Sequence, residues 1–330
     1  MPKMVRFHQL GGPEVLRIEE QPLKQPGEGE VRLKVEAVGL NRAELMFMLD
    51  QYVEHPKLPR GLGYEAAGVA QAVGPDVDKS WIGKHVSTIP SFSMNDYAML
   101  GEEVIAPAAA LAEYPAKLSP VEAAAIWMQY LTAYGALIAI AHVTKGDFVV
   151  ITAASSSVGI AAIEIAKAEG AVSIATTRKS NKKAELLSLG ANHVIATEEE
   201  DIVARVKEIT GGKGARVTFD PVGGPLVEKL AKAAAIGGTI FEYGLLSMQP
   251  TPFPLHTALP KGLCFRGYSL MEITLNPEKL PAAKKYVYDR LADGRFHPKI
   301  AKVLPFVQTV EAYKYLASNA QVGKVVITVP

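Results

Sequence analysis

The sequence has almost no cysteine and no excess charge of either sign. Cys264 is the only cysteine among 330 residues, which excludes an intramolecular disulfide and every structural zinc site that needs two or more thiolates. With no adjacent histidine, Cys264 is expected to be a buried small hydrophobe. No two of the seven histidines have the spacing of a local metal motif. The 35 Lys and Arg residues balance 34 Asp and Glu residues, which argues against nucleic acid as the main partner.

A secretory signal and a long apolar run are also missing. The first residues, MPKMVRFHQLGGPEVL, contain no apolar core of the kind that signal peptides need. The longest mostly apolar run, residues 131–143, is too short to span a bilayer. We therefore expect a cytoplasmic protein with no membrane partner. At ~150 residues per domain, the length predicts about two domains.

Two kinds of pattern divide the chain. Residues 30–38 alternate apolar with charged or small residues, which predicts a half-buried strand in a β-rich region. After the helix-start pattern Ser119-Pro-Val-Glu, strands and helices alternate, which predicts a doubly wound parallel sheet. The final strand, at residues 324–329, resembles the first region. We expect an α/β protein with a Rossmann domain (123–267) inserted in a β-rich catalytic domain (1–122 and 268–330).

A strand-to-helix turn at residues 154–159 is the candidate dinucleotide loop. Compared with G-x-G-x-x-G, Ala154 and Ser156 replace the first two glycines and Gly159 retains the third. The motif is weak alone, and a tight turn without ligand would look the same. Its context favours a ligand, because a strand precedes, a helix follows, and a second strand comes next. Small residues there let backbone N–H groups approach a pyrophosphate, and the serine hydroxyls can donate to it.

The end of the second strand indicates which cofactor binds. An Asp or Glu there would bind the ribose of NAD, but this strand ends in Thr176-Thr-Arg-Lys and no acid follows until Glu185. Arg178 and Lys182 could instead bind a 2′-phosphate, so the sequence predicts NADPH. A solvated basic helix start is the alternative reading, and Lys179 fits that surface role better than a ligand role.

Several segments together resemble a known family. They are Gly11-Gly-Pro-Glu-Val-Leu, Gly39-Leu-Asn-Arg-Ala-Glu-Leu, Gly61-Leu-Gly-Tyr-Glu-Ala-Ala-Gly, Leu131-Thr-Ala-Tyr-Gly-Ala-Leu, Ala153-Ala-Ser-Ser-Ser-Val-Gly, Leu189-Gly-Ala-Asn-His-Val-Ile and Gly323-Lys-Val-Val. In this order they resemble the zinc-independent, zeta-crystallin-like quinone oxidoreductases of the medium-chain dehydrogenase/reductase superfamily. The resemblance implies a GroES-like catalytic domain, a Rossmann domain, NADPH and a homodimer.

The resemblance also implies that no zinc is bound. Zinc alcohol dehydrogenases of the superfamily carry a cysteine in the segment around Asn41 and a His-Glu pair where this chain has Tyr64 and Glu65. Without the thiolate and the imidazole, ordinary alcohol oxidation loses its Lewis acid.

The resemblance assigns roles residue by residue. It places Asn41 and Thr132 by the nicotinamide and Tyr52 at the substrate mouth, with Tyr64 reshaping the pocket. The alternatives without a ligand are that Asn41 caps a loop, that Tyr52 is a surface aromatic residue and that Thr132 lies on the surface of a helix. The expected cofactor-binding residues are Asn41, Thr132, Ser155, Ser156, Ser157, Val158, Gly159, Thr177, Arg178, Lys182, Gly244, Leu245, Ser247, Phe265, Gly267 and Lys324.

The expected reaction is hydride transfer from NADPH to a small-molecule quinone or α,β-unsaturated carbonyl. Such acceptors need alignment and exclusion of water more than a strong acid. Tyr52 and Tyr64 are the candidate hydroxyls for the developing oxyanion, so Asn41, Tyr52, Tyr64 and Thr132 form the expected catalytic set. The alternatives are an enoyl-thioester reductase of the same superfamily and a non-catalytic NADPH-binding structural or RNA-binding protein. Asp220-Pro-Val-Gly-Gly is expected to be a turn.

Overall fold

The computed structural model describes all 330 residues, which form two compact units. The first unit contains Met1–Met128, Thr274–Leu280 and His297–Pro330, and the second contains Gln129–Ile273 and Pro281–Phe296. The second unit thus includes most of helix α10 (Leu280–Ala292), which lies outside the predicted Rossmann domain of 123–267. The domain boundaries stay a prediction, and each unit is described by itself below.

The first unit is built mainly on antiparallel strands, and only its strands β15 and β16 pair in parallel. A three-stranded sheet has the order β2-β1-β4, and a larger sheet has the order β15-β16-β3-β5-β6-β8, with β7 also paired to β3. Its strands are β1 (Lys3–Phe7), β2 (Arg17–Glu20), β3 (Glu30–Gly39), β4 (Arg60–Gly61), β5 (Glu65–Val73), β6 (His85–Thr88), β7 (Glu103–Pro107), β8 (Leu111–Glu113), β15 (Ile300–Pro305) and β16 (Lys324–Thr328). Its helices are η1 (Pro13–Val15), α1 (Arg42–Met48), η2 (Lys79–Trp81), η3 (Ala108–Ala110), α2 (Pro120–Ala123), η6 (Phe306–Gln308) and α11 (Thr309–Ala317).

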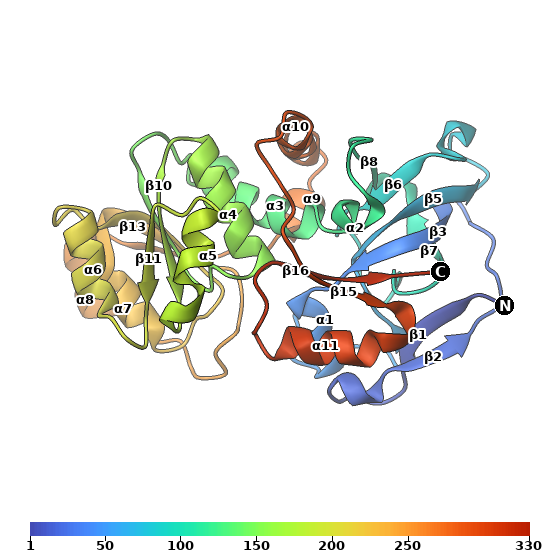
Figure 1. Ribbon diagram of the computed structural model, residues 1–330, viewed down its shortest axis with the longest axis horizontal. Coiled ribbons are helices and arrows are strands. Elements are labelled where there is room, and N and C mark those ends of the chain that lie inside the picture. The colour runs from blue at the N-terminus through green and yellow to red at the C-terminus, as the bar shows by residue number, and fades with distance from the viewer. The chain divides into compact units, whose positions relative to one another are not determined.

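Strand β3 organises the larger sheet. The predicted alternation is confirmed, because Val31, Leu33 and Val35 are fully buried while the charged residues between them face outward. β3 pairs antiparallel with β5, β7 and the C-terminal strand β16, so the C-terminal strand joins a sheet formed by strands from the first third of the chain (Figure 1). This pairing brings the start of β16 beside the end of β3, where α1 begins.

The second unit is a doubly wound sheet, as predicted. Its strands are all parallel, in the order β11-β10-β9-β12-β13-β14. They are β9 (Phe148–Ile151), β10 (Val172–Thr177), β11 (His193–Ala196), β12 (Ala215–Asp220), β13 (Ala234–Glu242) and β14 (Cys264–Gly267). The helices are α3 (Trp127–Tyr134), η4 (Gly135–Ile140), α4 (Ser157–Ala168), η5 (Ser180–Lys182), α5 (Lys183–Ser188), α6 (Ile202–Ile209), α7 (Leu226–Ala233), α8 (Leu255–Lys261), α9 (Met271–Thr274) and α10 (Leu280–Ala292).

Helices cover both faces of this parallel sheet, with α4 and α5 on one face and α6, α7 and α8 on the other (Figure 1). The strands are therefore apolar on both sides, and Val150, Ile174, Ile195 and Ile240 are buried in one core cluster. The strand order reverses direction between β9 and β12, and ligands of such sheets bind outside the carboxyl ends of the strands at this point.

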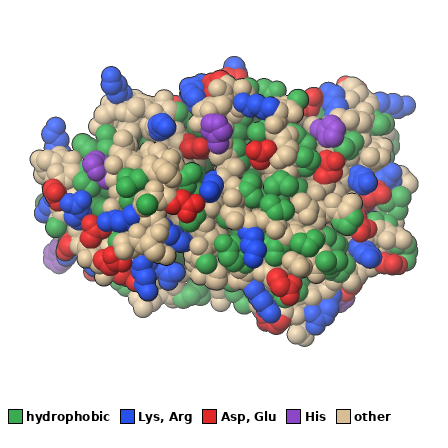
Figure 2. All heavy atoms as spheres, in the orientation of Figure 1, with side chains coloured by type: hydrophobic (Ala, Val, Ile, Leu, Met, Phe, Trp, Pro, Cys, Tyr) green, Lys and Arg blue, Asp and Glu red, His purple; other side chains and the backbone are tan.

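Two surface properties bear on the sequence expectations. Residues Pro120–Ile140 form a 21-residue helical stretch apolar enough to cross a membrane, but 72% of it is buried inside the protein, as in the core helices of soluble proteins. The apolar stretch is thus longer than the run of 131–143 suggested. Figure 2 shows basic and acidic side chains interspersed over the visible face, in keeping with the balanced composition.

Candidate functional site

The turn between β9 and α4 is strained and tightly packed. Ala153 has φ of 45°, in the left-handed region that non-glycine residues rarely adopt. A Cβ on Gly159 would lie 2.6 Å from the Cα of Ala154, so only glycine lets α4 approach the turn this closely. The structure therefore gives Gly159 the packing role of the third motif glycine, and it places the strain at Ala153 rather than Ala154. Such strain is characteristic of functional loops.

The N-terminus of α4 leaves two backbone donors without a partner inside the protein. Ser156 caps the helix, since its Oγ accepts a hydrogen bond of 3.0 Å from the backbone N–H of Gly159. The N–H groups of Ser157 and Val158 come first in the helix, where no intrahelical acceptor exists. These donors and the partial positive charge of the helix end fit an anion such as a pyrophosphate.

A pair of cations lies next to this turn. Thr177 ends β10 and is followed by the exposed Arg178, whose guanidinium forms no ion pair. The Lys182 ammonium lies 3.1 Å from the Ser155 Oγ, so the end of β10 and the loop after β9 meet. Burial and then the nearby Arg178 charge lower the pKa of Lys182. The nearby Glu185 charge opposes this lowering. Two cations this near to each other fit a phosphate group.

The remaining predicted cofactor residues of this unit follow neighbouring strands. Gly244, Leu245 and Ser247 come directly after β13, and Phe265 and Gly267 lie on β14, so their segments share the carboxyl edge of the sheet. Thr132 is buried on α3.

Two carboxyl groups that the sequence analysis did not connect lie at the same edge. Asp220 and Glu242 are paired neighbours at the ends of β12 and β13. Asp220 is buried and accepts hydrogen bonds from Thr152 and from the backbone N–H groups of Val222 (3.1 Å) and Gly223 (2.9 Å). These bonds make Asp220 the turn-forming residue that the sequence predicts.

Glu242 is the unusual member of this pair. Both its carboxyl oxygens are buried and receive no hydrogen bond from a protein donor. Burial, and then the charge of Asp220 and a hydrogen bond to it, raise the pKa of Glu242 to about 9. Glu242 is therefore a neutral acid near pH 7.

This pKa predicts a pH-dependent stability. The folded protein holds a proton on Glu242 between the unfolded pKa of ~4.3 and about 9, so this group's contribution to stability is present at low pH and is lost as the pH rises through about 9. Glu242→Gln mimics the neutral acid, and we expect it to be ~2 kcal/mol more stable relative to wild type at pH 9 than at pH 5. Urea unfolding at both pH values measures this difference. The exposed Glu198→Gln is the control, and equal pH dependence in wild type and Glu242→Gln would refute the assignment.

In the first unit, α1 begins on a buried carboxylate. Glu44 is fully buried, and it accepts hydrogen bonds from the backbone N–H of Asn41 (2.9 Å), the backbone N–H of Tyr64 (3.2 Å) and the Tyr313 hydroxyl (2.7 Å). Burial raises the pKa of Glu44, while these hydrogen bonds and the Lys324 charge oppose the rise. The spacing Asn41-x-x-Glu44 is that of a capping box, a signal in the sequence that could have identified Glu44.

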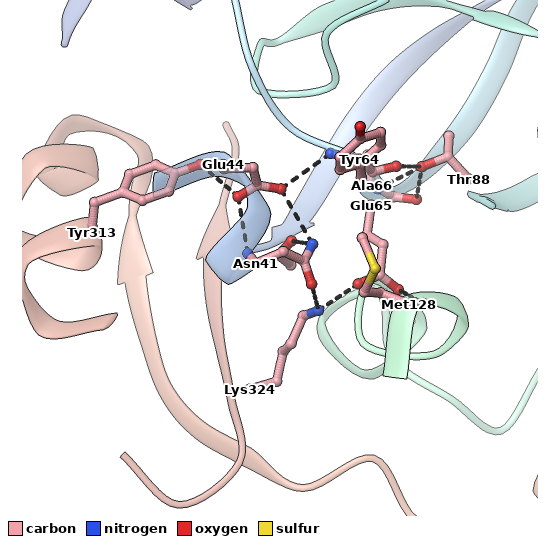
Figure 3. A network of polar contacts seen from close by, with 10 residues as sticks. Asn41, Glu44, Tyr64, Glu65, Ala66, Thr88, Met128, Tyr313 and Lys324 are labelled. Atoms are coloured by element: carbon pink, nitrogen blue, oxygen red, sulfur yellow. Dashed lines mark hydrogen bonds and ion pairs between the residues drawn. The ribbon is translucent and has the colours of Figure 1, made fainter. Parts of the chain in front are cut away.

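A buried ion pair adjoins this carboxylate (Figure 3). The Lys324 ammonium donates to Glu65 and, at 2.6 Å, to Oδ1 of Asn41, and Lys324 and Glu65 are each 1% exposed. The other oxygen of Glu65 accepts from the backbone N–H of Met128 at 2.9 Å. Lys324 was predicted to bind the cofactor, but the structure gives its ammonium protein partners.

The candidate phenols lie in one aromatic cluster. The rings of Tyr52 and Tyr64 are 6.5 Å apart, and that of Phe92 lies 5.7 Å from Tyr64. The Tyr64 hydroxyl donates to Glu54 at 3.2 Å, so it is not free to donate to a substrate oxyanion as expected. Burial raises the pKa of both tyrosines, so both phenols keep their protons at neutral pH. Tyr52 is the better candidate donor.

The structure also bears on the single cysteine and on the positions of possible metal ligands. Cys264 is exposed on β14, and the prediction of a buried cysteine is wrong because β14 is an edge strand that pairs only with β13. No group of three or more His, Cys, Asp or Glu side chains in the chain could hold a metal ion. At the positions of a zinc thiolate and imidazole stand Asn41 and Tyr64, and Glu65 is neutralised by an ammonium.

Comparison with known proteins agrees with this architecture. Residues 27–116 match the family described as the alcohol dehydrogenase GroES-like domain, and residues 157–287 match the zinc-binding dehydrogenase family. Quinone oxidoreductase 1 of Escherichia coli K12 is 32% identical over 331 residues, 98% of either chain. The chain belongs to the quinone oxidoreductase family of medium-chain dehydrogenases/reductases. Its membership confirms the predicted family, the GroES-like plus Rossmann fold class and the oxidoreductase class.

Two further relatives of this quinone oxidoreductase family member inform the chemistry. A 2-haloacrylate reductase from Burkholderia sp is 29% identical over 333 residues, 97% of either chain. The crystal structure of the Escherichia coli quinone oxidoreductase complexed with NADPH has a TM-score of 0.90 and 31% identity, and 99% of both chains is covered. The NADPH prediction agrees with that complex.

Proposed function

We propose that this family member transfers a hydride from NADPH to a small-molecule quinone or α,β-unsaturated carbonyl without zinc. The carrying observation is the cation pair of Arg178 and Lys182, which lies at the end of β10 against the β9–α4 turn. An acidic residue, which NAD-binding sheets use at this place, is missing. The names of the relatives, a quinone oxidoreductase and a 2-haloacrylate reductase, support this substrate class.

Residues of the second unit would bind the phosphates of the cofactor. NADPH supplies the hydride when it is bound. The N–H groups of Ser157 and Val158 would hold its pyrophosphate, and Arg178 and Lys182 its 2′-phosphate. The other proposed cofactor contacts are Asn41, Thr132, Ser155, Ser156, Gly159, Thr177, Gly244, Leu245, Ser247, Phe265 and Gly267.

The experiment that tests this function is a consumption assay with purified protein. NADPH or NADH is offered with 1,4-benzoquinone, an enone and crotonyl-CoA, each with and without EDTA. We expect NADPH-dependent reduction of the quinone or the enone, unchanged by EDTA. A preference for NADH would refute the cofactor assignment, loss of activity with EDTA would refute the zinc-free reaction, and turnover of crotonyl-CoA alone would favour the enoyl-thioester reductase.

Tyr52 is the proposed donor to the developing oxyanion. A phenol hydrogen bond there stabilises the transition state, so we expect Tyr52→Phe to lower kcat by ~10- to 100-fold with little change in KM for NADPH. Steady-state kinetics with the preferred acceptor measures the effect. Tyr97→Phe, in the same aromatic cluster, is the control. Unchanged turnover of Tyr52→Phe would remove Tyr52 from the mechanism.

We extend the proposal to a cytoplasmic homodimer. β14 is an unpaired edge of the Rossmann sheet, and Phe253, Leu255 and Leu259 are exposed just before it, at 61%, 50% and 71%. An open edge flanked by apolar side chains favours pairing with the same edge of a second copy. Light scattering should give twice the 35.4 kDa chain mass, and Leu259→Lys should give monomers. Leu187→Lys, on α5, should stay dimeric, and a monomeric wild type would refute the dimer.

A further inference from the structure

The loop that carries Tyr52 lacks the usual backbone anchors. Residues 52–58 lie between α1 and β4, and they form no backbone–backbone hydrogen bond. Val53, next to Tyr52, is 83% exposed, so its side chain buries little apolar area. Segments with few buried contacts and few backbone hydrogen bonds are the ones that open locally. Side-chain contacts must therefore hold this loop in place.

Glu54 supplies several of these contacts from within the loop. Its Oε1 accepts hydrogen bonds from the backbone N–H of Met94 (3.1 Å) and from the Tyr64 hydroxyl (3.2 Å). Its Oε2 accepts from the Ser93 hydroxyl and, at 3.4 Å, from Nδ2 of Asn95. One carboxylate thus binds four donors, which lie 10 and 39–41 positions further along the chain.

Asn95 adds a second attachment to the same loop. Its Nδ2 donates to the backbone carbonyl of His55 at 2.8 Å, and its Oδ1 accepts from the backbone N–H of Lys57 at 2.7 Å. The backbone N–H of Asn95 donates to Oγ of Ser93 at 2.9 Å, so the hydroxyl hydrogen of Ser93 remains for Glu54. The acid and the amide together fasten the loop to the turn at residues 93–95.

Tyr64 connects the Glu54 carboxylate to the Tyr52 ring. Tyr64 is 1% exposed, and its backbone is held on both sides. Its N–H donates to Glu44 at 3.2 Å, and its carbonyl accepts from the Thr88 hydroxyl at 2.8 Å. Its ring meets that of Tyr52 edge to face, with the centroids 6.5 Å apart. Glu54 therefore joins the loop to a fixed aromatic residue that packs against Tyr52.

We propose that Glu54 is a positioning residue that fixes the Tyr52 phenol by fastening its loop to Tyr64 and to residues 93–95. The inference rests on the proposed function, in which Tyr52 donates to the developing oxyanion. A donor that is aligned before the reaction lowers the barrier more than one that must first be ordered. In this role Glu54 acts through Tyr52 and not on the substrate.

The first test follows the loop without cofactor or substrate. Lys57 is exposed, so the rate of trypsin cleavage after Lys57 measures how often the loop opens. We expect Glu54→Ala to speed this cleavage ~10-fold, the change that follows from losing about one net hydrogen bond. Glu30→Ala is the matched control, because Glu30 also accepts from a tyrosine hydroxyl (Tyr97, 3.0 Å) and a backbone N–H (Gly27, 2.8 Å). It should leave the cleavage rate unchanged.

The second test measures turnover with the acceptor that the consumption assay identifies. We expect Glu54→Ala to lower kcat ~10-fold and to leave KM for NADPH unchanged, whereas Glu30→Ala should change neither. The loss should disappear in the Tyr52→Phe background, because a residue that acts through Tyr52 has no effect once the phenol is gone.

A conservative variant separates the hydrogen bonds of Glu54 from its charge. Glu54→Gln should stay within ~3-fold of wild-type kcat, because its Oε1 can still accept from Tyr64 and Met94 and its N–H₂ group can donate to Oγ of Ser93. A loss as large as that of Glu54→Ala would show that the charge acts, and would overturn the positioning role.

The outcomes distinguish this inference from the proposed function. A wild type without turnover would overturn the proposed function, while faster trypsin cleavage of Glu54→Ala would still support the attachment of the loop. With an active wild type, unchanged cleavage or unchanged kcat in Glu54→Ala would overturn the inference alone, as would a loss that persists in full in the Tyr52→Phe background. Circular dichroism establishes folding. If Glu54→Ala does not fold, Asn95→Ala serves, with ~3-fold faster cleavage expected and unchanged cleavage contradicting the inference.

Discussion

Replacing both Arg178 and Lys182 with alanine should weaken NADPH binding about 100-fold and leave NADH binding unchanged. Each cation would donate a charge-assisted hydrogen bond to the 2′-phosphate, worth ~1.5 kcal/mol, and two such bonds correspond to ~100-fold in Kd. NADH has no 2′-phosphate and so loses neither bond. The Kd values for both cofactors, measured by fluorescence titration, give the ratio directly.

A neighbouring lysine provides the matched control for this result. Lys179 is exposed one residue after Arg178, and Lys179→Ala removes the same charge without removing a proposed phosphate ligand. It should weaken NADPH binding less than twofold, since an exposed charge is largely screened at physiological salt. If Lys179→Ala weakens NADPH binding as much as the double variant does, Arg178 and Lys182 act only as part of a general basic surface. If the double variant loses as much affinity for NADH as for NADPH, Arg178 and Lys182 do not contact the 2′-phosphate.

Glu44→Ala should destabilise the first unit by ~4 kcal/mol, the largest stability effect that we expect from one substitution. The carboxylate is fully buried, and its loss leaves the backbone N–H groups of Asn41 and Tyr64 and the hydroxyl of Tyr313 without their acceptor. Each such buried donor costs ~1–3 kcal/mol. Differential scanning calorimetry should show the loss as a Tm lower by ~10 °C.

A milder variant separates the effect of lost hydrogen bonds from the effect of lost side-chain volume. Tyr313→Phe removes one of the donors to Glu44 and keeps the ring in the core, so we expect a loss of ~1–2 kcal/mol. If Glu44→Ala costs no more than Tyr313→Phe, the carboxylate does not hold the start of α1 in the way that the hydrogen bonds indicate.

The two sites differ in how far the sequence could predict them. In the second unit, the turn after β9, Gly159 and the basic residues after β10 are contiguous motifs, so the sequence could propose them as cofactor ligands, and the parallel topology places strand ends on one edge. Hydrogen-bond partners within that edge were not predictable. Glu242 becomes a neutral acid because its carboxyl group is buried and because strand register puts it beside Asp220.

In the first unit, the residue types were identified but the protein groups that contact them were not. Tyr64 was a candidate donor to substrate, yet its hydroxyl donates to Glu54. Lys324 was a candidate cofactor ligand, yet its ammonium is buried against Glu65 and Asn41. Local patterns specify which face of a strand a side chain occupies, but they do not specify what stands opposite it.

The sequence by itself determined the fold class, the dinucleotide turn, the basic pair after β10 and the absence of a multi-cysteine zinc site. All of these depend on composition, periodicity or residues close together in the chain. The tertiary structure alone decided that Lys324 meets Asn41 and Glu65, which lie 283 and 259 positions away. Their contact follows from the pairing of β16 with β3 and of β3 with β5. A period-2 pattern is compatible with many strand partners, so only the packed sheet selects these neighbours.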